Sequence, residues 1–117
     1  MIEHYSFGEI TVQGIRYTKD LIILCQGGNC KVYPNWWRKE GHFLQPEDLE
    51  VIWEARPEYL IVGTGASGVM KVDQRVIEKA KALGIKLEVA RTLEAVKRFN
   101  ELLGSVSSLA GAFHLTC

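Results

Sequence analysis

A glycine motif with the spacing G-x-G-x-x-G, at residues 63–68, directly follows the apolar run 59–62. After a strand, this spacing is typical of dinucleotide-binding loops, in which the amino end of a helix meets a pyrophosphate. Here residues 69–72 intervene before the next predicted helix, and Asp73 at its cap would repel a phosphate. The chain also lacks the second half of a doubly wound domain. The pattern therefore argues against a dinucleotide site.

The same loop could still bind a smaller ligand. It lies at the carboxyl end of a predicted parallel strand, where ligands of α/β sheets usually bind, and its amides could form an anion-binding nest. Lys71 and Arg91 would add positive charge for an anionic or carbonyl ligand. The alternative is a tight turn that needs glycine for positive φ or for close packing. The candidate ligand-binding residues are Gly63, Thr64, Gly65, Ser67, Lys71 and Arg91.

The three cysteines, Cys25, Cys30 and Cys117, predict reduced thiols in a cytoplasmic protein. Their number is odd, and the first residues have the pattern of neither a signal peptide nor a transit peptide. Cys25 and Cys30 flank four residues with turn character and could face each other, so a redox pair is the alternative. Neither a second cysteine pair nor a suitably spaced histidine follows, and we expect no metal site.

Other polar and aromatic residues give weaker indications of chemistry. His114 and Cys117 are three positions apart on a predicted strand and would point to opposite faces, so we expect a buried, hydrogen-bonded His114. Asp20 could be a catalytic acid, although a hydrogen-bonded turn is the default interpretation. Trp36 and Trp37 are predicted to pack over the sheet, with an interface hot spot as the alternative. The sequence indicates no catalytic residue.

Composition limits the function classes further. The chain has 117 residues, of which 47% are hydrophobic and 24% charged, as is typical of one soluble globular domain. Its 14 basic and 14 acidic residues give a net charge of zero, which argues against nucleic acid and anionic membranes as partners. No apolar run is long enough to span a membrane.

The N-terminal half predicts a meander of short antiparallel strands. Polar and apolar residues alternate over 9–13 and 15–17, and the continuous apolar run 21–25 is typical of a buried strand. A Gly-Gly-Asn turn then leads to a return strand at 31–33. A helix follows, with Pro46 in its first turn and Pro57 after its end.

The C-terminal half predicts a β-α-β-α-β unit. We expect strands at 59–62, 85–89 and 109–115 and helices at 74–83 and 93–103. Asp73 is the predicted N-cap of the first helix and Thr92 that of the second. The predicted inner faces are Val76, Ile77, Ala80 and Leu83, then Ala95, Val96, Phe99, Leu102 and Leu103.

Two successive βαβ units imply three parallel strands with right-handed crossovers. The predicted fold is therefore a single compact α/β domain over residues 1–117. It combines an N-terminal antiparallel meander with the β-α-β-α-β unit in a mixed sheet, and helices pack beside that sheet.

Several segments also match one family in combination. They are residues 8–10, 14–17 with Asp20, 37–42 (WRKEGH), 60–65 (LIVGTG), 92–96, 99–102 and 112–117 (AFHLTC). Together they resemble the Mth938-domain family of small α/β proteins, which is related to the mitochondrial complex I assembly factor 3 and to the adipogenesis-associated Mth938 domain-containing protein.

The resemblance covers nearly the whole chain and implies the family's fold, with helices packed beside a β-sheet. It implies no settled catalytic activity, and the mitochondrial members act through protein partners. We expect a cleft among the residues at the family's motif positions, which are Asp20, Trp37, Arg38, Gly63, Thr64, Gly65, Thr92, Asn100 and His114.

The function we expect is that of a non-catalytic protein-interaction or assembly module without a cofactor. Its partner would be an unidentified protein or a second copy of the chain. The alternative is a small-molecule binding domain, or a minor enzyme, that uses the loop 63–68. A redox protein that uses Cys25 and Cys30 is the third hypothesis.

Overall fold

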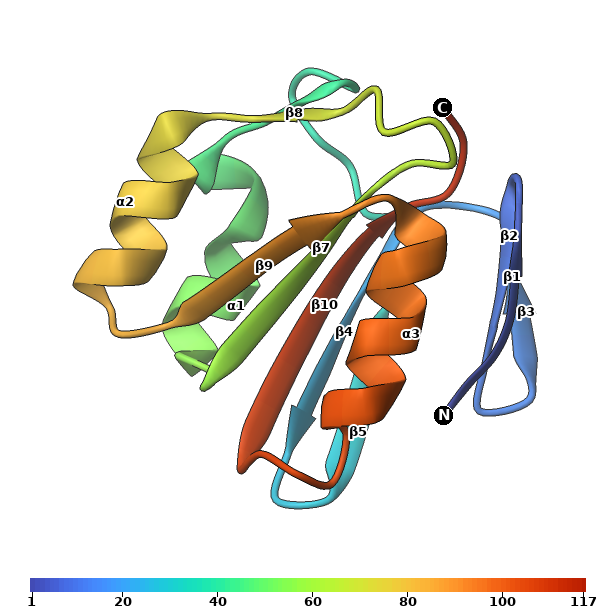
Figure 1. The fold of residues 1–117 in the computed structure, drawn as a ribbon, viewed down its shortest axis with the longest axis horizontal. Coiled ribbons are helices and arrows are strands. Elements are labelled where there is room, and N and C mark those ends of the chain that lie inside the picture. Colours follow the sequence, from blue (N-terminus) through green and yellow to red (C-terminus); the bar gives the residue numbers. More distant parts are fainter.

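A five-stranded mixed sheet with the order β5-β4-β10-β7-β9 forms the centre of the protein (Figure 1). The computed structural model describes all residues from Met1 to Cys117. Strand β10 runs parallel to β7, which runs parallel to β9, whereas β4 is antiparallel to both β10 and β5. The five strands are β4 (Leu21–Gln26), β5 (Asn29–Tyr33), β7 (Tyr59–Thr64), β9 (Lys86–Ala90) and β10 (Ser108–His114). The predicted mixed α/β fold is thus confirmed.

Helices cover both faces of this sheet. Helix α3 (Thr92–Leu102) lies on one face, as Figure 1 shows, whereas α1 (Glu50–Ala55) and α2 (Gln74–Ala82) lie on the other. A 3₁₀ helix, η1 (Pro46–Leu49), leads into α1. Alternate residues of β4 point to opposite faces, so Leu21, Ile23 and Cys25 join the α3 core and Ile22 and Leu24 join the α1–α2 core.

Close packing explains the small residues in the central strand β10. A Cβ atom at Gly111 would lie 2.5 Å from the Phe113 ring and 2.9 Å from the Phe99 ring. These two rings meet edge to face with their centroids 5.7 Å apart. Glycine at this position therefore lets α3 approach the sheet closely.

The N-terminal meander is divided between two sheets, which the sequence did not predict. Strands β1 (Ile2–Ser6), β2 (Glu9–Val12) and β3 (Ile15–Tyr17) form a separate three-stranded sheet, and only β4 and β5 join the central one. Two further short strands, β6 (Phe43–Leu44) and β8 (Lys71–Val72), pair in parallel outside both sheets. Their pairing ties the segment after Gly41 to the segment after the glycine loop.

The predicted start of α2 is confirmed, and that of α3 needs a correction. Asp73 caps α2 and accepts a hydrogen bond from the Arg75 amide at 3.0 Å. Thr92, in contrast, is the first residue of α3 and not its cap, which is Arg91. Thr92 is fully buried because its hydroxyl bonds to other segments of the chain. Ile77 was expected on the inner face of α2, but its side chain is exposed to solvent.

The expectation of three reduced thiols is wrong for two of them. Cys25 and Cys30 form a disulfide between β4 and β5, with their Cα atoms 4.0 Å apart. Gly27 and Gly28 both have positive φ, and the tight turn that they form places the two cysteines opposite each other. Cys117 is free and exposed. No helix of the protein has the length and apolar character needed to cross a membrane.

Candidate functional site

Residues 115–117, which follow β10, connect several parts of the molecule. The Leu115 carbonyl accepts hydrogen bonds from the Gly8 amide at 2.9 Å and from the Tyr5 hydroxyl at 3.0 Å. The Leu115 amide donates to Oδ1 of Asp20 at 2.8 Å. This segment therefore lies between the β1–β2 turn and the start of β4, at the carboxyl ends of the parallel strands.

A cluster of Asp20, Arg38 and His114, in which Arg38 and His114 are buried and Asp20 is half-buried, lies directly beside this segment. Nδ1 of His114 is 2.7 Å from Oδ2 of Asp20, and Nη2 of Arg38 is 2.9 Å from the same oxygen. Arg38 also donates to the Gly41 carbonyl through Nε at 3.1 Å and Nη2 at 2.8 Å. The cluster thus joins the end of β10, the start of β4 and the loop 34–41.

Opposing effects act on the Asp20 carboxyl group. Burial raises its pKa, but hydrogen bonds from His114 and the Leu115 amide, together with the charges of His114 and Arg38, lower it more. The net result is a pKa below the usual value for aspartate, so Asp20 is a carboxylate at neutral pH. Its role is to compensate the buried Arg38, because an unpaired buried charge is strongly unfavourable.

The remaining nitrogen atoms of the cluster are enclosed by the protein. Nε2 of His114 and Nη1 of Arg38 are buried without a hydrogen-bond partner, and the His42 ring packs edge-on to His114 at 5.5 Å. These atoms do not reach the surface, so a substrate in solution would not contact them. The predicted buried, hydrogen-bonded state of His114 is confirmed by this geometry.

The cluster fixes the conformation of the tryptophan loop, residues 34–41. The Arg38 guanidinium stacks over the Trp36 ring at 4.6 Å, and Nε1 of Trp36 donates to the Asp48 carbonyl at 2.8 Å. Trp36 is half-buried, whereas 77% of the Trp37 surface is exposed. The prediction that both tryptophans pack over the sheet therefore holds only for Trp36.

A surface cavity of about 460 Å³ opens beside Trp37. Trp36, Trp37 and Asn35 line it from the loop, and Lys19 and Asp20 line it from the start of β4. Thr116 closes the remaining side.

The backbone amides of the glycine loop bind other parts of the protein. The Ala66 amide donates to the Thr116 carbonyl at 2.7 Å, and the Val69 amide donates to the Cys117 carbonyl at 2.9 Å. Gly65 has a φ of 104°, and a Cβ atom there would lie 2.3 Å from the carbonyl carbon of Cys117. The loop accordingly packs against residues 116–117, and these amides are not open to an anion.

Thr92 links the glycine loop to strand β10. Its hydroxyl donates to the His114 carbonyl at 2.6 Å and accepts the Gly65 amide at 2.8 Å. A Cβ atom at Gly63 would lie 2.8 Å from the same hydroxyl oxygen, so Gly63 allows this contact. Thr64 donates to the Ala90 carbonyl at 3.1 Å. These contacts explain why Thr92 is buried instead of capping α3.

Lys71 and Arg91 both line a groove on the side of the glycine loop that faces away from residues 116–117. The groove has a volume of about 420 Å³, and Thr64, Ser67 and the apolar Val89 also line it. No acidic residue lines the groove. The two cations that the sequence placed near the loop thus share one open surface.

The residues at the family's motif positions separate into distinct places. Asp20, Arg38 and His114 form the buried cluster, and Trp37 lies on the surface beside it. Asn100 is elsewhere: its side chain donates to the Ile2 carbonyl at 2.8 Å and accepts the Ile2 amide at 3.1 Å. It therefore attaches β1 to α3.

Sequence reasoning missed two exposed apolar residues near this site. Phe7 is 63% exposed in the β1–β2 turn, next to the Gly8 amide that bonds to Leu115. Val69 is 41% exposed, and its amide bonds to Cys117. The only feature of the sequence that could have indicated this exposure is the position of Phe7 in a turn, between Ser6 and Gly8.

Comparison with known proteins places this geometry in a family. The family described as "Protein of unknown function (DUF498/DUF598)" matches residues 2–114. Among solved structures, a conserved hypothetical protein, PH1505, from Pyrococcus horikoshii OT3 has 26% sequence identity and a TM-score of 0.77, with 100% of this chain and 99% of that chain covered. A structure named MT938 has 29% identity and a TM-score of 0.79, with 100% and 98% covered.

A more distant structure shares the fold. A Bordetella pertussis protein described as a Mth938-like domain has 17% identity and a TM-score of 0.59, with 98% of this chain and 85% of that chain covered.

Proposed function

Because the chain belongs to the DUF498/DUF598 family of proteins of unknown function and has the Mth938-like fold, we propose that it is a protein-interaction module. Its binding surface would be the face around residues 115–117, which we call the tail face. The face consists of Phe7, Trp37 and Val69 around that segment, with Lys19 beside Trp37.

The observation that carries this proposal is the exposure of Trp37 between two fixed neighbours. Trp36 is held by its hydrogen bond to the Asp48 carbonyl, and Arg38 is held by its ion pair with Asp20. The backbone at Trp37 is thereby restrained, although most of its side chain contacts solvent. A rigid, exposed tryptophan is typical of binding hot spots, because little conformational entropy is lost when a partner covers it.

The surroundings of Trp37 indicate the chemistry of the partner. Phe7 and Val69 extend the apolar surface on either side of residues 115–117. Lys19 lines the cavity next to Trp37, and Lys71 and Arg91 lie in the groove beyond the glycine loop. Apolar side chains edged by unpaired cations complement a protein segment that carries apolar and acidic residues.

The experiment compares affinity capture from native extract by three immobilised forms: the unchanged protein, Trp37→Ala and Ile15→Ala. Ile15 is a matched control because it is also exposed and apolar but lies on β3 of the small sheet. We expect a stoichiometric protein that the unchanged chain and Ile15→Ala retain and that Trp37→Ala releases. Direct titration of the purified partner should show at least about a 30-fold weaker Kd for Trp37→Ala, as for a hot-spot residue.

Two outcomes would contradict the proposal. One is a partner that binds all three forms equally, since the binding surface would then lie elsewhere. The other is a chain that retains no protein and remains a monomer in light scattering at high concentration. A dimer that Trp37→Ala dissociates would identify a second copy of the chain as the partner.

The groove of Lys71 and Arg91 supports a second candidate function, the binding of a small anionic or carbonyl ligand. Two cations in a groove without an acidic residue favour negative charge. A thermal-shift screen over inorganic anions, nucleotides and acyl metabolites tests this function. A ligand that raises the Tm of the unchanged chain and of Lys97→Ala, but not of Arg91→Ala, would support it. The absence of any shift would contradict it.

A further inference from the structure

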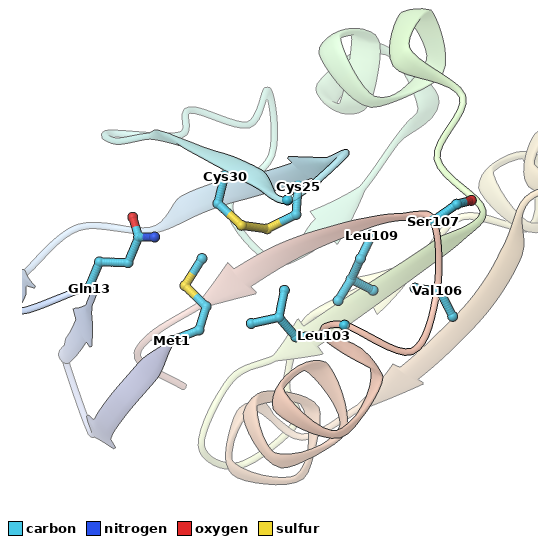
Figure 2. Close-up of a pocket in the computed structure, with 10 residues that line it drawn as sticks. Met1, Gln13, Cys25, Cys30, Leu103, Val106, Ser107 and Leu109 are labelled. Carbon is cyan, nitrogen blue, oxygen red and sulfur yellow. A yellow bond between two sulfur atoms is a disulfide. The ribbon is translucent and has the colours of Figure 1, made fainter.

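A separate cavity lies at the opposite end of strand β10 and contains the disulfide (Figure 2). Its volume is about 260 Å³, and both cysteines line it together with the apolar side chains of Leu103, Val106 and Leu109. Figure 2 shows the two sulfur atoms projecting from the β4–β5 hairpin toward the space in which Met1 and Leu103 lie. The disulfide thus borders the cavity on one side, while Cys25 packs into the core under α3 on the other.

The disulfide adds little to the geometry of the hairpin. The tight turn at Gly27 and Gly28 fixes the register of β4 and β5, and β4 is also paired with β10 along its whole length. The two cysteines are only five positions apart, so their bond closes a very short loop and restrains the unfolded chain less than a long-range disulfide would. Both facts indicate that the hairpin can persist when the bond is reduced.

The cavity favours uncharged compounds. No charged side chain is among those that line it, and the one charged group on a lining residue, the N-terminal ammonium of Met1, is paired with Oε2 of Glu3 at 3.3 Å. Ser107 lines the cavity, and its hydroxyl donates to Oε1 of Glu58 at 3.1 Å, which places a carboxylate next to the lining. A thiol whose body carries an additional negative charge would be repelled there, whereas a thiol with an uncharged, apolar body fits the Leu103, Val106 and Leu109 side chains.

We propose that Cys25 and Cys30 form a reversible thiol–disulfide exchange site whose substrates are small, uncharged thiols. The proposal stands apart from the tail face, because the two lie at opposite ends of β10. It assigns a chemical reaction to a part of the molecule that partner binding does not use.

The exchange proceeds in two steps that balance. The thiolate of the substrate attacks Sγ of Cys30 and forms a new sulfur–sulfur bond; Cys30 is the more exposed of the two residues, since Cys25 is only 6% exposed. The Cys25–Cys30 bond breaks, and its electron pair remains on Sγ of Cys25, which takes up a proton. A second substrate thiolate attacks the external sulfur of the mixed disulfide and releases Cys30, which is also protonated. Two external thiols are oxidised to one disulfide, and the protein gains two electrons and two protons.

The test compares two thiols that differ mainly in charge, 2-mercaptoethanol and 2-mercaptoethanesulfonate, at equal thiolate concentration. The loss of the disulfide is followed by alkylation and mass spectrometry, and circular dichroism monitors the fold. We expect the neutral thiol to react about fivefold faster at low salt, as one unit of charge repulsion near a surface predicts. The difference should shrink at about 1 M salt, where the charges are screened.

Two substitutions with a matched control locate the reaction in the cavity. Val106→Trp should slow the neutral thiol at least about fivefold by filling the entrance, whereas Leu93→Trp, exposed at the other end of α3, should react as the unchanged chain does. If Val106→Trp does not fold, Leu103→Ala serves instead, and it should react faster because it enlarges the cavity. Equal rates for the two thiols, unchanged rates in the cavity variants, or loss of the fold on reduction would each overturn the proposal.

Discussion

At the carboxyl end of strand β10, His114 belongs to a buried polar cluster, whereas at the amino end Leu109 lines an apolar cavity beside a disulfide. In the first region, hydrogen bonds and an ion pair connect Asp20, Arg38 and His114; Asp20 borders a surface cavity, but the unpaired nitrogen atoms of Arg38 and His114 do not reach solvent. The second has a disulfide that borders a cavity with no charged side chain in its lining.

The difference follows from the cost of burying different groups. A buried charge needs partners, so the Asp20 carboxylate binds groups from the loop 34–41, from β10 and from residue 115. Apolar side chains have no such requirement, and the amino end can therefore leave a cavity unfilled. The polar region accordingly restrains the backbone on both sides of Trp37, whereas the apolar region leaves a cavity beside the disulfide, where the proposed exchange would take place.

The largest effect on stability should come from removing the carboxylate of the cluster. In Asp20→Ala, Arg38 and His114 lose their shared acceptor inside the protein, and the Leu115 amide loses its partner. We expect the free energy of unfolding to fall by about 3–5 kcal/mol, as when one member of a buried ion pair is removed. Urea denaturation measures it.

The matched control for this variant is Arg16→Ala, which removes an exposed ion pair of similar length, 2.8 Å to Glu9. Its effect should be far smaller, because solvent screens exposed charges. If the two variants lose the same stability, the cluster contributes no more to stability than an exposed ion pair does.

A slightly smaller loss of stability is expected when a glycine is replaced near either end of strand β10. Gly65→Ala should lose about 3 kcal/mol, because positive φ and a clash with Cys117 add together. Gly104 also has positive φ, but a Cβ atom added there would meet no atom within 4 Å, so Gly104→Ala should lose only about 1 kcal/mol. Thermal unfolding of the two variants measures both losses of stability. Equal losses would mean that residues 116–117 do not pack on the glycine loop.

Reduction of the disulfide tests how much the region at the amino end of strand β10 contributes to stability, without any substitution. The bond closes a short loop in a hairpin that is already paired with β10, so the reduced protein should be at most about 2 kcal/mol less stable than the oxidised protein. Urea unfolding with and without a neutral thiol gives the difference. A loss of stability as large as that of Asp20→Ala would contradict this expectation, because the region at the amino end of β10 would then depend strongly on the disulfide.

The smallest expected effect is the pH dependence of stability that Asp20 causes. The pKa of Asp20 is lowered in the folded protein, so its stabilising contribution is present above the unfolded value of about 4 and is lost as the pH falls through the folded pKa. In this acidic window, the unchanged chain should lose stability more steeply than Asp20→Asn, by no more than about 1.4 kcal/mol per pH unit for one proton. Parallel curves of unfolding free energy against pH would show that Asp20 does not titrate in this way.

Local patterns in the sequence were sufficient to predict the C-terminal β-α-β-α-β unit. The apolar run before Gly63 and the cap at Asp73 depend only on neighbouring residues, and both elements start near the predicted positions. The late start of α2, at Gln74 and not directly after Gly68, could be predicted for the same reason. The turn at Gly27 and Gly28 likewise placed Cys25 and Cys30 face to face, although the sequence did not favour their oxidation.

The contacts of the site depended on tertiary structure. Asp20 and His114 are 94 positions apart, and Arg38 and His114 are 76 apart, so no local pattern could bring them together. Thr92 has the features of a helix cap in the sequence, but the His114 carbonyl, from a distant strand, accepts its hydroxyl proton. The exposure of Trp37 was decided in the same way, because it depends on the anchoring of Arg38 by Asp20 and His114. Sequence determines the elements through interactions between near neighbours, whereas the packing of distant strands determines which polar groups meet.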